Sequence, residues 1–168
     1  MPIPGGYEIR EHMADIIVRA WGDSLPELFE QAAEGLYAVI GELAWTPGEA
    51  VDVRLTAADA DDLLHDYLAE LLFIFETQHA VLAQRRSLLL SETQLHVAAQ
   101  RCPLDWERCT FHREVKAVTY HGLQVERRDP GHAAPAEGGS VAERPGSQGE
   151  PQRVQGDGGY AAEIILDI

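Results

Sequence analysis

Ionisable side chains stand near both ends of this sequence, each beside an apolar stretch. Near the start, REHMADIIVRAWG places Glu11, His12 and Asp15 before a run that is typical of a buried strand. At the end, GYAAEIILDI alternates as a strand does and carries Asp167 and the terminal carboxylate of Ile168. If these two strands are neighbours in one sheet, Asp15 and Asp167 converge. Carboxylates are hard oxygen ligands that suit Ca²⁺ or Mg²⁺, with His12 as a nitrogen ligand or a support.

The same acids have two other interpretations. Strand-end carboxylates usually face solvent, and sequence distance does not show whether Asp15 meets Asp167. Paired carboxylates also perform general acid–base catalysis, which keeps a metal-dependent hydrolase as an alternative. That alternative lacks an evident nucleophile, because the sequence contains no G-x-x-x-x-G-K-[ST], G-x-S-x-G or H-E-x-x-H motif. Cys102 and Cys109 match no common zinc-ligand spacing and are interpreted as incidental.

A second polar group lies in EVKAVTYHG, which predicts a strand followed by a turn. One interpretation is structural: alternate residues pack, while Lys116 and its polar neighbours face water. The functional interpretation is that the end of this strand presents Lys116, Tyr120 and His121 to a ligand or partner.

Charge and composition narrow the class of partner. The 168 residues contain 13 Lys and Arg against 28 Asp and Glu, a formal net charge of -15. This excess argues against direct binding of duplex nucleic acid, which needs clustered cations. It suits a protein that binds cations or docks on a basic partner, or one that acidity simply keeps soluble. No signal-peptide layout and no apolar run of about 18 residues is present, so we expect a cytoplasmic protein without a membrane span.

The elements that must position these residues follow from periodicity. Ser24 and Glu27 form a capping box before a helix that Gly41 can end. DDLLHDYLAELLFIFETQ predicts a second, more buried helix, in which His65 is expected to be a structural histidine. Strands are predicted for VDVRL, SLLL, TQLHVAAQ, REVKAVTYHGLQVER and the closing segment. We therefore predict one α+β domain spanning residues 1–168, with two helices on one face of a mostly antiparallel sheet of five or more strands.

Residues 129–159 differ from the rest of the chain. The segment is rich in Gly, Pro, Ala and Glu and nearly free of large apolar side chains. It cannot bury enough surface to offset its ordering entropy, so we expect a disordered loop inserted before the C-terminal strand.

The order of four segments resembles the archease family. They are EHMADI, DDLLHDYLAELLFIFET, EVKAVTYHGLQVE and GYAAEIILDI, and together they span nearly the whole chain apart from the Gly/Pro-rich loop. In that family the opening motif usually reads Asp-His-Thr-Ala-Asp, and the chain ends in a similar Leu/Ile-Asp-Ile. This sequence has Glu11 in place of the first Asp and Met13 in place of Thr. Glu11 keeps the carboxylate but reaches further by roughly 1.5 Å, and Met13 lacks the hydroxyl.

The resemblance implies a specific activity. Archeases are small α+β proteins that are not enzymes and that assist an RtcB-type RNA ligase in tRNA splicing and RNA repair. They promote GTP-dependent guanylylation of the ligase's active-site histidine, so that the ligase turns over repeatedly. A second implied role is that of a chaperone-like modulator of RNA-modifying enzymes such as methyltransferases.

The resemblance also implies roles for individual residues. Asp15 and Asp167 match the family's metal-binding acids, with Glu11 and Ile168 beside them. His12, Lys116, Tyr120 and His121 are expected to support this site or to contact the partner. An all-oxygen site accepts Ca²⁺, Mg²⁺ or Mn²⁺, and Ca²⁺ is the ion we expect first.

Overall fold

The computed structural model describes residues 5–12, 14–120, 122–127 and 159–168. The α-helices of this part are α1 (Leu25–Ile40) and α2 (Ala60–Gln78), and η1 (Trp106–Arg108) is a short 3-10 helix. The strands are β1 (Gly6–His12), β2 (Asp15–Gly22), β3 (Gly41–Glu42), β4 (Glu49–Thr56), β5 (Ala80–Ser91), β6 (Gln94–Pro103), β7 (Thr110–Phe111), β8 (Ala117–Val118), β9 (Gln124–Arg127) and β10 (Tyr160–Asp167).

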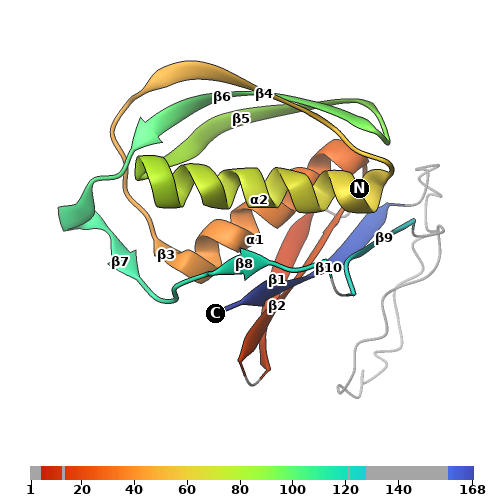
Figure 1. Ribbon diagram of the computed structural model, residues 1–168, viewed down its shortest axis with the longest axis horizontal. Helices are drawn as coiled ribbons and strands as arrows, with labels where there is room; N and C mark the ends of the chain where they lie inside the picture. Colours follow the sequence, from red (N-terminus) through yellow and green to blue (C-terminus); the bar gives the residue numbers. More distant parts are fainter. Residues whose placement is uncertain (1–4, 13, 121, 128–158) are drawn as a thin grey trace, which may run out of the picture.

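All strand pairings in the described ranges are antiparallel and form three sheets. The largest sheet has the order β1-β2-β10-β8, and β9 also pairs with β10. A three-stranded sheet has the order β4-β6-β5, and β3 pairs with β7. Figure 1 shows α1 and α2 between the five-stranded and the three-stranded sheet. The predicted α+β class, with two helices and mostly antiparallel strands, is confirmed.

The three-stranded sheet is a difference in detail from the sequence prediction, which placed both helices on one face of a single sheet. The physical reason lies in α2, which is covered from two sides and buries Leu63, Leu64, Leu68, Leu71 and Ile74. A helix that is apolar over so wide a face needs a partner layer on each side. The strands that supply this second layer were predicted, but period-2 patterns do not say which strands share a sheet.

The segment REVKAVTYHGLQVER is also less regular than predicted. Among its described residues, Ala117–Val118 and Gln124–Arg127 are the strands, and residues 112–116 lie outside regular pairing. A turn separates the two strands, since the Leu123 N–H donates to the Tyr120 carbonyl at 3.2 Å. Gly122 adopts φ +70°, a left-handed conformation that glycine adopts without strain.

The helix starts follow the expected capping chemistry. Ser24 caps α1, accepting a hydrogen bond from the Glu27 N–H at 3.3 Å, and the Glu27 carboxylate accepts from the Asp23 N–H at 2.9 Å. Asp59 caps α2 and accepts from the Asp62 N–H at 2.9 Å. The bonds to Ser24 and Asp59 satisfy N–H groups in the first helical turn that have no intrahelical partner, and the bond from Asp23 holds the residue before the cap against that turn.

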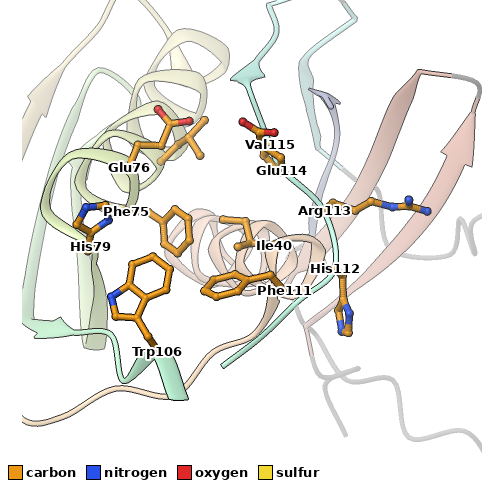
Figure 2. A pocket seen from close by; sticks show the side chains of 11 residues that line it. Ile40, Phe75, Glu76, His79, Trp106, Phe111, His112, Arg113, Glu114 and Val115 are labelled. Atoms are coloured by element: carbon orange, nitrogen blue, oxygen red, sulfur yellow. The ribbon is translucent and has the colours of Figure 1, made fainter. Parts of the chain in front are cut away.

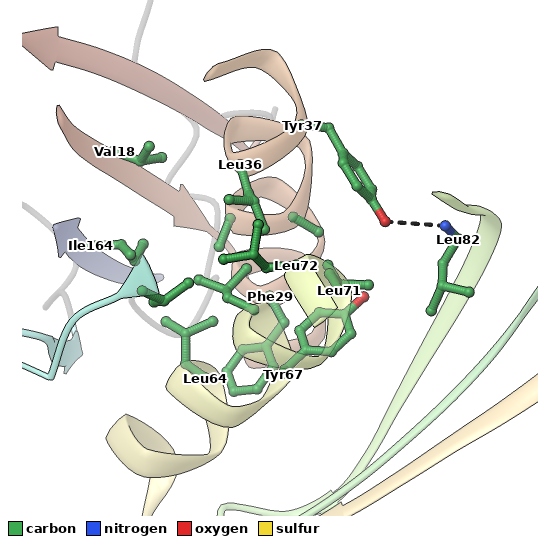
Figure 3. Packing of buried hydrophobic residues seen from close by; sticks show 14 of the residues in the cluster. Val18, Phe29, Leu36, Tyr37, Leu64, Tyr67, Leu71, Leu72, Leu82 and Ile164 are labelled. Carbon is green, nitrogen blue, oxygen red and sulfur yellow. Dashed lines mark hydrogen bonds between the residues drawn. The ribbon is translucent and has the colours of Figure 1, made fainter. Parts of the chain in front are cut away.

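The core joins all three layers. In Figure 3, Val18 and Ile164 of the five-stranded sheet face Leu36 of α1 and Leu72 of α2. On the other side, the buried Tyr37 hydroxyl accepts a hydrogen bond from the Leu82 N–H of β5 at 3.1 Å. Burial raises the pKa of Tyr37 to about 12, so this hydroxyl stays neutral near neutral pH.

Residues 129–158, most of the predicted loop, lie outside the described residues. The strands on either side of it, β9 and β10, pair with each other in antiparallel register. Within the described part of the chain, neither helix is long and apolar enough to cross a bilayer.

Candidate functional site

Asp15 and Asp167 face each other across the pairing of β2 with β10. The register pairs Asp15 with Asp167 directly and pairs Ile16 with Leu166 in the next position. Ile16 and Leu166 are buried against the helices, so alternation places both aspartates on the opposite face of the sheet. Both are partly buried. Directly opposed residues in an antiparallel pair have Cβ atoms roughly 4.5–5.5 Å apart, which is close enough for one small ion to contact both carboxylates.

Residues of β1 and β8 are the next register partners on either side of Asp15 and Asp167. His12 is the register partner of Asp15, and Ala117 is the partner of Asp167. The Lys116 N–H, just before β8, donates to the Asp167 carbonyl at 2.7 Å. His12, Asp15 and Asp167 therefore form one row across three neighbouring strands, and we call them the acidic row. Lys116, an exposed residue, lies next to its end.

Glu11 does not join the acidic row. Its register partner is the buried Ile16, so it lies on the helix-facing side of β1, opposite to Asp15. Its carboxylate accepts a hydrogen bond from the Arg113 guanidinium, in an exposed ion pair. The chain reverses between residues 12 and 15, and for this reason the even spacing of Glu11 and Asp15 does not put them on one face. Arg113 was not singled out by the sequence, because residues 102 positions apart carry no local signal of their pairing.

Ile168 and Tyr120 occupy different surroundings. The Ile168 side chain is partly buried against the core, directly after Asp167. Tyr120 stacks on His65 of α2, with ring centroids 3.5 Å apart and planes 18° apart. Its hydroxyl donates to Asp66 at 3.2 Å. Partial desolvation, then the carboxylates of Asp66 and Asp62, raise the pKa of Tyr120, so the phenol stays protonated at neutral pH. His121 and the side chain of His12 lie outside what the structure describes.

His65 connects α2 to this region. Its Nε2 lies 2.8 Å from the Val118 carbonyl of β8, and its Nδ1 lies 3.1 Å from the Asp66 carboxylate. A carbonyl oxygen can only accept, so Nε2 carries a proton and donates it to Val118. The sequence prediction of a structural histidine agrees with this position, where only 8% of His65 is exposed. Its contact with Val118 holds α2 against the strand next to the acidic row.

The donor set at the acidic row suits a hydrated divalent cation. Among the described side chains, no group of three or more His, Cys, Asp or Glu residues is arranged to hold a metal ion. Two neighbouring carboxylates nonetheless match the way in which Mg²⁺ is bound, through one or two carboxylates with water completing the shell. Ca²⁺ takes six to eight oxygens and would need more water or further oxygens here.

Comparison with known proteins adds independent information. The archease protein family matches residues 7–168 of this chain. The archease of Methanopyrus kandleri is 36% identical over 127 residues, covering 73% of this chain and 91% of that protein. The archease of Methanosarcina acetivorans is 37% identical over 140 residues, covering 80% and 96% of the two chains.

Two solved structures share the fold. Protein 1598 of Methanobacterium thermoautotrophicum has a TM-score of 0.60 and 24% identity, covering 97% of this chain and 99% of that chain. An archease of Thermotoga maritima, described as a possible chaperone, has a TM-score of 0.57 and 19% identity, covering 96% of each chain. The family match over nearly the whole chain, together with relatives above 30% identity, shows that this protein belongs to the archease family.

Proposed function

We propose that this protein is a non-enzymatic activator of an RtcB-type RNA ligase in tRNA splicing and RNA repair, acting in the cytoplasm. It promotes GTP-dependent guanylylation of the ligase and so supports multiple turnover. Family membership supports the accessory role. The observation that carries the site is the register of β2 with β10, which puts Asp15 directly opposite Asp167.

In this proposal Asp15 and Asp167 hold a divalent cation, with His12 and Lys116 beside them. Ca²⁺, Mg²⁺ and Mn²⁺ all suit oxygen donors. When bound, such an ion neutralises phosphate charge during nucleotidyl transfer. Asp15 and Asp167 position the ion on the face of the sheet that points away from the helices, and the partner approaches from that side. Lys116, Tyr120 and His121 are assigned to contact with that partner.

The net charge of -15 suits this partner. A ligase that handles RNA carries basic surface, so an acidic activator is attracted to it and does not compete for the nucleic acid. We do not expect this protein to bind duplex nucleic acid directly.

The test is RNA ligation by the cognate ligase under single- and multiple-turnover conditions, with GTP and a divalent metal. We expect wild-type protein to raise the number of turnovers, and Asp15→Asn and Asp167→Asn to lose at least about tenfold of that stimulation, since each removes a charged ligand. Glu163→Gln is the matched control, because Glu163 is another acid on the same face of β10. Full stimulation by both Asn variants would contradict the metal role.

The same experiment separates the alternatives. Stimulation that survives in both variants leaves the activator role standing and returns Asp15 and Asp167 to a structural role. No stimulation of the ligase by the wild-type protein favours a chaperone-like modulator of RNA-modifying enzymes. The exposed aromatic rings of Trp106 and Phe111 are the observation that favours that role. Hydrolysis of a phosphoester by the isolated protein, lost in Asp15→Asn, would identify a metal-dependent hydrolase.

A further inference from the structure

A pocket of about 400 Å³ lies away from the acidic row, between the end of α2 and the segment that follows η1. Its size is within the range of small-ligand sites, roughly 300–1,000 Å³. Figure 2 shows Phe75, Trp106 and Phe111 grouped together, with the carboxylates of Glu76 and Glu114 on another side of the pocket.

Aromatic faces form one wall. The ring centroids of Trp106 and Phe111 are 5.3 Å apart with planes at 42°, and those of Phe75 and Phe111 are 6.4 Å apart at 62°. Rings inclined in this way present faces in several directions. Trp106 is 53% exposed and Phe111 is 44% exposed. Two large neighbouring rings that remain open to solvent are typical of a binding surface.

Two carboxylates also line the pocket, together with His79 and His112. Glu76 and Glu114 are exposed, and the structure gives neither side chain a hydrogen bond or an ion pair among the described residues. Glu76 lies in the last turn of α2, where the negative end of the helix disfavours a carboxylate. A contribution to the stability of α2 therefore does not explain why a carboxylate occupies position 76. Arg113 also lines the pocket but is paired with Glu11, and in Figure 2 its guanidinium points away.

We propose that this pocket is a docking site for an arginine side chain presented by a partner protein. A guanidinium stacks on aromatic faces and donates planar, charged hydrogen bonds to carboxylates, and both kinds of group line this pocket. Anionic ligands are disfavoured by Glu76, Glu114 and the overall charge of -15, while a basic partner segment is attracted. The inference does not depend on the role in RNA ligation, because it concerns the isolated protein and a basic segment.

The probes are three capped tripeptides: Gly-Arg-Gly, Gly-Lys-Gly and Gly-citrulline-Gly. Citrulline keeps the shape of arginine without its charge. Binding is followed by amide and indole N–H chemical shifts of the isotope-labelled full-length protein, which detects millimolar affinities. We expect the arginine peptide to shift the Trp106 indole and the amides around Glu114. The citrulline peptide is expected to bind at least about fivefold more weakly, and the lysine peptide in between.

Variants locate the site. Glu76→Gln and Glu114→Gln are each expected to weaken the arginine peptide by about two- to fivefold, and Trp106→Leu by a similar factor. Glu92→Gln, which removes an exposed acid in the β5–β6 turn, is the control and should leave affinity unchanged.

Four results overturn the proposal. One is the absence of Trp106 shifts at any arginine-peptide concentration tested. The second is equal affinity for the arginine and citrulline peptides, which would indicate an apolar site. The third is equal weakening by Glu92→Gln, which would indicate non-specific attraction. The fourth is a dependence of the Trp106 shift on protein concentration alone, which would assign the pocket to a second copy of this chain. None of these outcomes bears on the ligation assay, so the two proposals fail separately.

Discussion

At the scale of single residues, the opposed aspartates of the acidic row are locally unfavourable. Like charges at directly opposite positions of an antiparallel pair destabilise it. Four residues along the same strands, Arg19 faces Glu163 with opposite charges. One face of the sheet thus carries a repulsive pair, Asp15 and Asp167, and an attractive pair, Arg19 and Glu163. The attractive pair stabilises the fold, whereas the repulsive pair does not.

We predict that Asp15→Asn stabilises the protein by about 0.2–1 kcal/mol without divalent metal, because it removes this repulsion. Glu163→Gln should have the opposite sign, since it removes an attraction of the same geometry. Urea unfolding in the presence of a chelator measures both. A loss of stability in Asp15→Asn equal to that in Glu163→Gln would show that the carboxylates do not repel, and would argue against their closeness.

The sequence predicts that Asp15 and Asp167 converge only if their two strands are neighbours in the sheet. The apolar runs after Asp15 and before Asp167 predict two strands, and the register shows that these strands are neighbours. No local pattern predicts that these two strands are neighbours, because residues so far apart in the chain share no periodicity. Glu11 is a carboxylate, as the predicted site requires, but the chain reversal between β1 and β2 places it on the other face of the sheet.

At the scale of elements, His65 is a contact between a helix and the strand next to the acidic row. The Nε2–H donates to the Val118 carbonyl, and the ring supports Tyr120. The helical pattern of α2 predicted a structural histidine, but its partner comes from a strand 53 residues later, which helix periodicity does not reveal.

We predict that His65→Leu destabilises the protein by about 1–3 kcal/mol, because the buried carbonyl loses its donor. His65→Gln should cost less, since its amide N–H lies close to where Nε2 was. Denaturant unfolding with unchanged m-value would measure both. Equal losses for the two variants would mean that ring packing, and not the hydrogen bond, is what His65 contributes.

The second sheet is the element-scale feature that the sequence predicted least well. Both β5 and β6 are visible as strand patterns, yet their place beyond the helices depends on side chains such as Tyr37 and Arg85. Arg85, only 6% exposed, pairs with Glu30 and Glu34 of α1. It lies at an irregularity in β5 between Ala83 and Arg86, where an added residue changes the direction of side chains. Period-2 patterns do not predict such an interruption.

At the scale of the whole molecule, charge is the dominant feature. A net charge of -15 repels itself in the compact state, and this repulsion reaches about 30 Å at 0.01 M salt but only about 8 Å at 0.15 M. We predict that the free energy of unfolding increases between these salt concentrations. Urea unfolding with NaCl, without divalent ions, measures it. A decrease would show that exposed ion pairs such as Arg101–Glu49 outweigh the repulsion.

The central position of β10 has a consequence for how the protein is made. β2 ends at Gly22, whereas β10 begins only at Tyr160. At about 5–20 residues per second, the ribosome needs roughly 7–30 s to synthesise the chain between them. During that time the β2 edge that β10 will cover remains open to pairing with other chains. An unfinished chain lacks Asp167, so the acidic row forms only once β10 has been translated.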